Sequence, residues 1–130
     1  MKKIRRKISV TTGTRAEYGL LRSVLTELKK NSNIDLCLIV TGMHLSQKYG
    51  KTINLIKKDG FKISYQFSMI PKKDTSYDMA KSLGEGIINF SSVFRKFNPD
   101  INLILGDRGE SFASAIAAFH MNIPNAHIHG

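Results

Sequence analysis

The feature that most constrains the fold of this sequence is a regular alternation of apolar runs with amphipathic segments. Residues 34–41 form a nearly continuous apolar run, which is typical of a strand buried on both faces of a parallel sheet. Four further strands are predicted at residues 7–12, 62–68, 101–105 and 125–129. Apolar residues at helical spacing predict helices at residues 16–30, 46–58, 75–97 and 108–121.

Strands that alternate with helices predict an α/β domain, here a Rossmann-like parallel sheet with right-handed crossovers. The expected strand order is 3-2-1-4-5. In such a sheet, ligands bind at the carboxyl ends of the strands, at the point where the strand order reverses. We therefore expect functional residues in the loops after the first, second and fourth strands, with the end of the fifth strand nearby.

Composition restricts the function less than this pattern does. The chain of 130 residues suits one domain, and its 20 Lys and Arg against 10 Asp and Glu make a formal net charge of +10. This charge favours an anionic partner without choosing between nucleic acid, nucleotides and anionic lipid. The single cysteine, Cys37, excludes an internal disulfide. Since no apolar window suits a membrane span or a signal peptide, we expect a cytoplasmic protein with no membrane partner.

The loop after the first predicted strand is a candidate anion site. Gly13 permits a tight turn, the helix N-terminus that follows favours anions, and Arg15 offers a bidentate donor for phosphate. The glycine spacing matches neither a dinucleotide-binding fingerprint nor a P-loop. Thr14 and Glu17 have the spacing of a capping box. Phosphate contact and a plain strand-to-helix turn with Arg15 in solvent are equally supported.

The loop after the fourth predicted strand contains Asp107, a candidate general acid or base. The same residue suits the N-cap of the next helix, with Glu110 three residues later in a capping-box-like pair. The two roles are compatible, although the local pattern alone favours the cap.

Three histidines follow or lie in predicted strands. His44 follows the second strand, and His127 and His129 are expected on the same side of the fifth. Their spacing matches no specific zinc signature, so no metal is expected. General acid–base chemistry by one of them is more plausible, because histidine titrates near neutral pH.

Four segments at the ends of these strands carry a resemblance to a known family. They are TGTRAEYGLL from Thr12, VTGMHLSQKYGKT at residues 40–52, LGDRGE at residues 105–110 and IPNAHIHG at residues 123–130. Together they resemble the N-terminal part of the UDP-N-acetylglucosamine 2-epimerase family, most of all its hydrolysing, sialic-acid-pathway branch. They run in the family's order and span almost the whole chain.

The resemblance implies a fold and a reaction. Residues 1–130 would be the N-terminal lobe, itself incomplete, of a two-domain glycosyltransferase-B-like enzyme whose C-terminal lobe is absent, and we expect this chain alone to be inactive. The implied reaction eliminates UDP from UDP-N-acetylglucosamine to form a glycal. Addition of water then gives N-acetylmannosamine for sialic acid biosynthesis. The implied enzyme needs no cofactor and is a homo-oligomer, a dimer or a tetramer, when full length.

The resemblance also implies roles for individual residues. Asp107 and His129 would be catalytic. The substrate-binding residues would be Gly13, Arg15, His44, Arg108 and His127. The family's usual second carboxylate falls at His129, which leaves the second proton-transfer group open. Non-hydrolysing relatives have Lys and Gln where this chain has Leu20 and Met43, so activation by a second UDP-sugar is not expected.

Three alternatives remain at this stage. One is the same reaction on a UDP-2,4-diacetamido-trideoxyhexose, on the way to legionaminic-type acids. Another is a glycosyltransferase of the same fold, which would need no acid–base pair at Asp107 and His129. The third is a basic nucleic-acid-binding module, against which no RNP-like motif or recognition-helix pattern is present.

Overall fold

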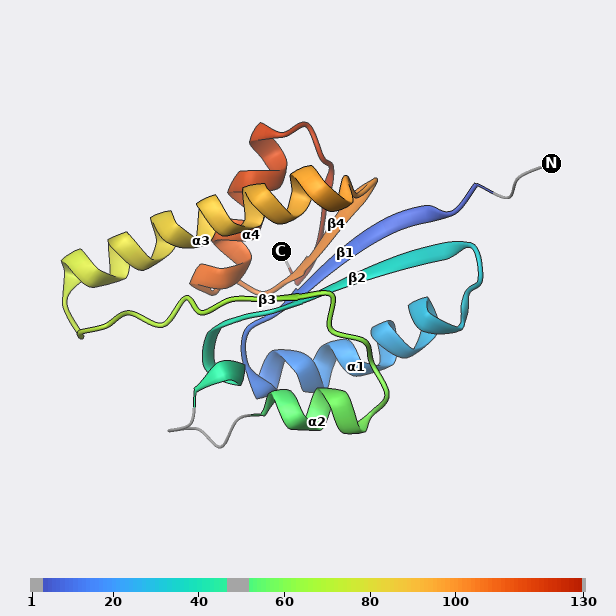
Figure 1. The fold of residues 1–130 in the computed structure, drawn as a ribbon, viewed down its shortest axis with the longest axis horizontal. Helices are drawn as coiled ribbons and strands as arrows, with labels where there is room; N and C mark the ends of the chain where they lie inside the picture. The colour runs from blue at the N-terminus through green and yellow to red at the C-terminus, as the bar shows by residue number, and fades with distance from the viewer. Residues whose placement is uncertain (1–3, 47–51, 130) are drawn as a thin grey trace.

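The computed structural model describes residues 4–46 and 52–129, and a five-stranded parallel sheet lies at its centre (Figure 1). The sheet order is β3-β2-β1-β4-β5, which confirms the predicted fold class and strand order. The strands are β1 (Arg6–Thr12), β2 (Ile34–Val40), β3 (Tyr65–Gln66), β4 (Ile101–Leu105) and β5 (Asn125–Ile128).

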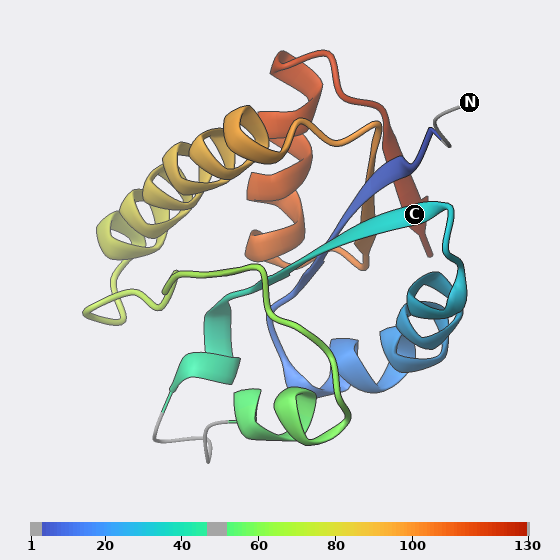
Figure 2. The same ribbon diagram turned by 45° about the vertical axis from the view of Figure 1, so that its right-hand side comes forward.

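Four α-helices of the described residues cover the two faces of the sheet. They are α1 (Arg15–Lys30), α2 (Ile53–Lys58), α3 (Ser76–Phe97) and α4 (Gly109–His120). Figures 1 and 2 show α1 and α2 on one face and α3 and α4 on the other. In the described part of the chain, no helix combines the length and the apolar character needed to cross a membrane.

Strand β2 explains the long apolar run in the sequence. Leu38 and Val40 belong to the buried cluster on the α1 and α2 face. Cys37 and Ile39 belong to the cluster on the α3 and α4 face. Because successive side chains of a strand point to opposite faces, a central strand covered on both sides needs apolar residues at every position.

Two predicted elements differ from the observed ones. The helix expected at residues 46–58 is replaced by a short 3-10 helix, η1 (Gly42–Leu45), and by α2, while residues 47–51 lie outside the described part. The strand expected at residues 62–68 shrinks to β3. This strand pairs with β2 alone, so one neighbour supplies all of its ladder bonds.

Helix α3 continues through Gly84 and Gly86, although glycine in a helix interior is unfavourable. Gly86 is buried, and the Met69 side chain packs against it where a Cβ atom would otherwise lie. The Ser82 hydroxyl also donates a hydrogen bond to the Met69 carbonyl. Gly86 is therefore a packing position for the segment before α3 rather than a break in the helix.

A buried amide connects the central strands with α4. Asn102 of β4 accepts a hydrogen bond from the Ser9 hydroxyl through Oδ1, at 2.8 Å. Its Nδ2 donates to Ser114 Oγ at 2.9 Å and to Asn125 Oδ1 at 3.0 Å. One side chain thus joins β1, β4, α4 and β5, which fixes the position of α4 on the sheet.

We predict that Asn102→Ala lowers the free energy of unfolding by about 2–3 kcal/mol, because it leaves several buried polar groups without partners. Urea denaturation followed by far-UV circular dichroism measures this change. Asn54→Ala, at an exposed position of α2, is the control and should change stability by less than about 0.5 kcal/mol. Equal effects of the two variants would contradict the structural role of Asn102.

Candidate functional site

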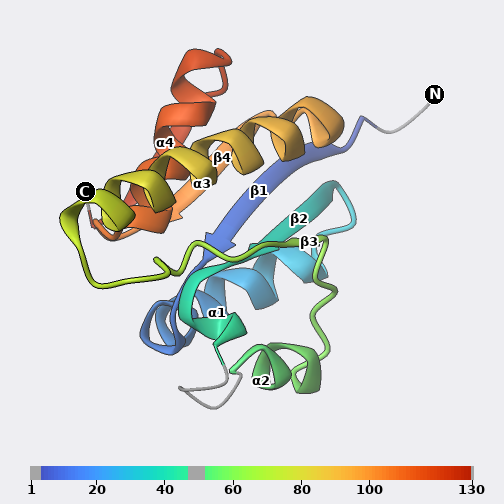
Figure 3. The same cartoon turned by 60° about the vertical axis from the view of Figure 1, so that its left-hand side comes forward.

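The loops singled out in the sequence meet at one edge of the sheet. All five strands are parallel, so their carboxyl ends lie together. In Figure 3, β1 and β2 both end on the side where the C-terminus lies. This is the edge at which ligands bind in open α/β sheets.

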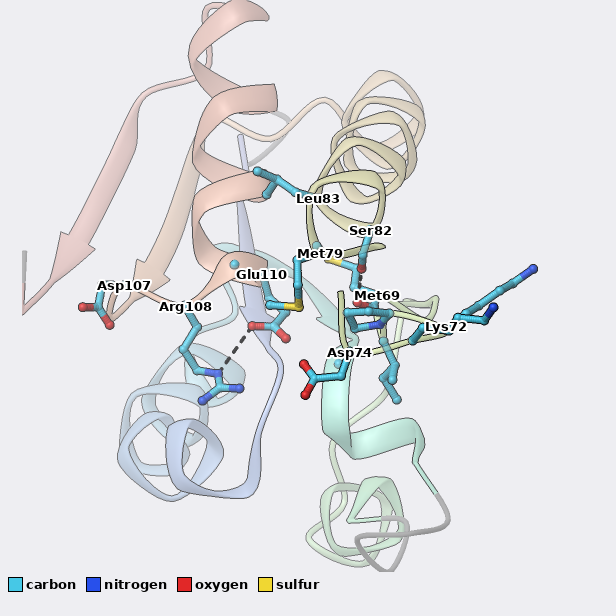
Figure 4. Close-up of a pocket in the computed structure, with 14 residues that line it drawn as sticks. Met69, Lys72, Asp74, Met79, Ser82, Leu83, Asp107, Arg108 and Glu110 are labelled. Carbon is cyan, nitrogen blue, oxygen red and sulfur yellow. Dashed lines mark hydrogen bonds and ion pairs between the residues drawn. The ribbon is translucent and has the colours of Figure 1, made fainter. Parts of the chain in front are cut away.

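A cavity of about 800 Å³ opens at this edge (Figure 4). Its walls are Gly42, residues 69–74, residues of the first two turns of α3, and residues 107–110. Two of the predicted site residues, Asp107 and Arg108, therefore lie in its wall.

Asp107 does not cap helix α4, so the interpretation of this residue as an N-cap is wrong. The N-cap position is Arg108, which makes no capping bond with its side chain. Asp107 is exposed, and its carboxylate takes part in none of the hydrogen bonds between the described residues. In Figure 4 it points away from Glu110, on the far side of Arg108. Its carboxylate is thus free for chemistry.

Hydrogen bonds hold the turn before Asp107 to the end of β5. The Gly106 N–H donates to the Ile128 carbonyl at 3.2 Å. Nε2 of His127 lies 2.6 Å from the Gly106 carbonyl, and since a carbonyl only accepts, this nitrogen carries the proton. Asp107 directly follows Gly106, and His129 directly follows Ile128. The hydrogen bond between Gly106 and Ile128 therefore brings the two predicted catalytic residues to neighbouring positions at the carboxyl edge of the sheet.

The expected side of His129 needs a correction. Strand β5 ends at Ile128, and His129 has a φ of 59°, in the left-handed region. The strand geometry that would place it on the same side as His127 therefore does not extend to it. His129 is exposed, and its catalytic role stays a prediction.

The first turn of α1 confirms Thr14 as the N-cap, but Glu17 bonds to the Gly13 N–H and not to the Thr14 N–H of an ordinary capping box. Thr14 Oγ1 accepts a hydrogen bond from the Glu17 N–H at 3.2 Å. Glu17 Oε1 accepts from the Gly13 N–H at 3.1 Å and from the Thr14 hydroxyl at 3.3 Å. Arg15 is the exposed first residue of this helix, and its phosphate contact stays a prediction.

Glu17 and Glu110 form a buried carboxylate pair at this edge. Burial raises the pKa of Glu17, and the neighbouring carboxylate of Glu110 raises it further. The hydrogen bonds from Gly13 and Thr14 and the charge of Arg108 oppose this rise in pKa. We had interpreted both glutamates only as capping residues, although Glu110 lies within the motif that contains Asp107.

His44 lies beneath the site and not in its open part. It has no exposed surface, and its ring nitrogens contact Thr12 Oγ1 at 2.9 Å and Thr52 Oγ1 at 2.6 Å. Burial lowers the pKa of His44 to about 4, so the ring is neutral at physiological pH. Its observed contacts join the end of β1 to the start of α2. A direct contact with substrate stays a prediction that this burial does not favour.

The structure adds a wall that we did not predict. Residues 69–74, to which the sequence assigns no role, line the cavity opposite residues 107–110. Their sequence, Met-Ile-Pro-Lys-Lys-Asp, matches no motif that would have indicated a function. Among the described residues, no group of three or more His, Cys, Asp or Glu side chains could hold a metal ion.

The parallel sheet and the cavity at its carboxyl edge are typical of α/β proteins that bind ligands at this edge. Comparison with known proteins shows to which family of such proteins the chain belongs. The model of the family described as UDP-N-acetylglucosamine 2-epimerase matches residues 26–130. The chain therefore belongs to the UDP-N-acetylglucosamine 2-epimerase family, as its motifs indicated.

Curated relatives include hydrolysing epimerases. The chain is 49% identical over 96% of its length to "UDP-N,N'-diacetylbacillosamine 2-epimerase (hydrolyzing)" of Legionella pneumophila, covering 33% of that protein. It is 40% identical over 96% of its length to "Polysialic acid biosynthesis protein P7" of Escherichia coli, covering 32% of it. It is 36% identical over 97% of its length to "GDP/UDP-N,N'-diacetylbacillosamine 2-epimerase (hydrolyzing)" of Campylobacter jejuni, covering 33%. The chain thus spans about a third of the length of these relatives.

Solved structures agree with this family. A UDP-N-acetylglucosamine 2-epimerase structure matches 97% of the chain and 33% of its own length, with a TM-score of 0.82 and 25% identity. A Methanocaldococcus jannaschii epimerase in complex with UDP-GlcNAc and UDP matches 95% of the chain and 32% of its own, with a TM-score of 0.78 and 27% identity. MurG of Acinetobacter baumannii, at 12% identity, shares the fold alone, with a TM-score of 0.73 over 94% of the chain and 34% of its own. The predicted glycosyltransferase-B-like lobe is confirmed.

The burial of His44 predicts a pH-dependent stability. Its pKa is about 4 in the folded protein and about 6.5 in the unfolded chain. Between these values only the unfolded state binds the proton, so stability is lost as the pH falls from about 6.5 to about 4. The loss amounts to up to about 3 kcal/mol.

Urea denaturation from pH 7.5 to pH 4.5 measures this loss. His44→Gln should show a shallower decline with falling pH than the wild type. His120→Gln, at an exposed histidine at the end of α4, is the control and should decline as the wild type does. The burial argument fails if His44→Gln keeps the full pH dependence.

Proposed function

We propose that the full-length protein is a hydrolysing UDP-sugar 2-epimerase and that this chain supplies the N-terminal side of its cleft. One observation carries the proposal, which is the 49% identity over almost the whole chain to a hydrolysing epimerase of Legionella pneumophila. The chain spans about a third of that relative. We therefore propose that residues 1–130 are part of a two-lobed enzyme whose second lobe binds much of the nucleotide.

The favoured substrate is a UDP-2,4-diacetamido-trideoxyhexose. The relatives from Legionella pneumophila and Campylobacter jejuni are both named for UDP-N,N'-diacetylbacillosamine, which belongs to this class. The relative from Escherichia coli, named for polysialic acid biosynthesis, supports UDP-N-acetylglucosamine as the second candidate. The identity of 49% to the Legionella pneumophila relative, against 40% to the Escherichia coli relative, favours the diacetamido sugar and reverses the order of substrates expected from the motifs.

The proposed reaction breaks the C2–H and C1–O bonds of the sugar and forms a C1=C2 double bond, with UDP as the leaving group. Water then adds across this bond, with hydroxyl at C1 and a proton at C2 on the opposite face. The first step needs a base for a weakly acidic proton, and the whole reaction needs control of water. Asp107, exposed in the cavity wall and free of a capping role, suits proton transfer.

Neighbouring residues suit supporting roles. His129 lies beside Asp107 at the end of β5 and is the candidate for the second proton transfer. His127 holds the turn that carries Asp107. Arg15 and Arg108 are exposed cations at helix N-termini and suit the diphosphate.

The remaining parts of the proposal follow from the reaction. Such an enzyme needs no redox cofactor, and a cytoplasmic homo-oligomer, a dimer or a tetramer, is expected. A glycosyltransferase remains the alternative of the same fold, and it would transfer the sugar to an acceptor instead of releasing it. Family membership makes a nucleic-acid-binding module a much poorer explanation of the basic charge.

We predict that the full-length protein releases UDP from UDP-N,N'-diacetylbacillosamine with at least tenfold higher kcat/KM than from UDP-N-acetylglucosamine. Released UDP is measured by a coupled assay, and the sugar product by NMR, which reports inversion at C2. Heat-denatured enzyme is the control. A preference for UDP-N-acetylglucosamine would restore the second candidate, whereas no release of UDP from either substrate would overturn the proposed function.

We predict that Asp107→Asn lowers kcat about 100- to 10,000-fold, the range expected for loss of a general acid or base. The melting temperature should stay within about 2 °C, because Asp107 does not cap α4. Asp35→Asn, near the amino end of β2, is the control and should leave kcat unchanged. Full activity of Asp107→Asn would remove this residue from the mechanism.

A further inference from the structure

Glu110 has a buried oxygen atom without a hydrogen-bond partner. Its side chain is only 13% exposed, although it lies in the first turn of α4. Among the described residues, no group donates a hydrogen bond to its buried Oε2. Burying a carboxylate oxygen without a hydrogen-bond donor costs free energy. Such an atom is therefore a candidate for binding a ligand that supplies the donor.

Two loops are shaped around this side chain. A Cβ atom at Gly13 would lie 2.9 Å from Cγ of Glu110. A Cβ atom at Gly42 would lie 2.7 Å from Oε1 of Glu110, and this glycine also has a φ of 66°. Any other residue at either position would displace the carboxylate. Its place at the sheet edge is therefore built into the loops after β1 and β2.

The nearest groups do not satisfy Glu110. Nε of Arg108 lies 3.5 Å from Oε2, which makes an ion pair without a hydrogen bond, and the Arg108 side chain is 46% exposed. The Gly13 N–H and the Thr14 hydroxyl donate to Glu17 instead. The donors closest along the chain are thus already used.

A ligand in the cavity lies beside Glu110, and it reaches the buried Oε2 once the half-exposed Arg108 side chain moves aside. The residue lines this cavity together with Asp107 and Arg108, and Figure 4 shows Arg108 and Glu110 turned toward one another in its wall. A diphosphate has only acceptor atoms and negative charge, so it does not suit a carboxylate. The sugar of a nucleotide sugar carries hydroxyl and amide N–H donors, which do.

We propose that Glu110 is a substrate-binding residue whose Oε2, which has no hydrogen-bond donor in the described structure, accepts a hydrogen bond from a hydroxyl or amide N–H of the sugar. The inference rests on the proposed function, since it assumes that a UDP-sugar enters this cavity. It places the sugar, and not the diphosphate, against the end of β4, next to Asp107.

The test is a double-mutant cycle between Glu110 and the substrate, carried out with the full-length protein. Wild type, Glu110→Ala and Glu110→Gln are compared on the preferred UDP-sugar and on analogues that each lack one hydroxyl or amide N–H donor. We expect Glu110→Ala to lower kcat/KM about 10- to 100-fold on the complete sugar, as for loss of a hydrogen bond to a charged group. The loss should shrink below about threefold on the analogue that lacks the contacted donor.

Two variants serve as controls. Glu110→Gln keeps an acceptor oxygen and the same shape, so it should recover part of the activity and gives the result if the alanine variant does not fold. Glu85→Gln, at an exposed position of α3, should leave kcat/KM unchanged on every substrate.

The outcomes separate this inference from the proposed function. If Glu110→Ala and Glu110→Gln reduce kcat/KM by the same factor on every analogue, Glu110 only supports the loops and the inference is wrong. If the wild type releases no UDP from any UDP-sugar, the proposed function fails, and the inference fails with it. A loss that disappears with one particular donor supports both.

Discussion

The candidate site is centred on the parallel pairing of β1 with both of its neighbours. Thr12 pairs with Val40 of β2, and Val10 pairs with Leu103 of β4. Because these strands run in one direction, the loops that follow them leave the sheet at the same edge. This pairing brings Gly13, Gly42 and Glu110 together, although nearly a hundred residues separate the first from the last.

The groups gathered at this edge do not favour the folded state. The pKa of buried Glu17 is raised, that of buried His44 is lowered, and Glu110 has an oxygen atom without a donor. The surroundings of Glu17 and His44 oppose the charged form of each group, and those of Glu110 leave one oxygen without a hydrogen-bond donor. Stability must come from the two apolar clusters on the faces of the sheet, which lie away from the edge. Ionisable groups under such conditions are typical of functional sites.

Much of the fold was predictable because the spacing of apolar residues along the sequence indicates which faces of a strand or helix are buried. The apolar run of β2 and the sheet order are examples that the structure confirms. The length of β3 was not predictable. An edge strand extends only as far as it pairs with its one neighbour, whatever the length of its own pattern of alternating apolar and polar residues. The Ser64 and Phe67 N–H groups still bond to β2 beyond its two residues, so the alternation marked extended chain correctly.

The sequence predicted where the site lies better than it predicted which residues contact one another there. The rule for parallel sheets put Asp107 at the correct edge, yet local spacing assigned it to a cap that the backbone places at Arg108. Glu110 was missed for the same reason. A spacing of three residues describes neighbours along a helix, whereas the partners of Glu110 are glycines from two other loops. Contacts between distant loops leave no periodic trace in the sequence.

The charge of the cavity bears on the kind of ligand more directly than the net charge of +10 does. Its charged wall residues are three basic and three acidic ones, namely Lys72, Lys73, Arg108, Asp74, Asp107 and Glu110. A polyanion such as nucleic acid would bring phosphates against all three carboxylates, which opposes binding. A nucleotide sugar has an anionic part for the basic residues and a neutral part rich in hydrogen-bond donors for the acidic ones. The mixture of charges therefore fits a ligand with both parts, and the basic surface elsewhere has no need to contact it.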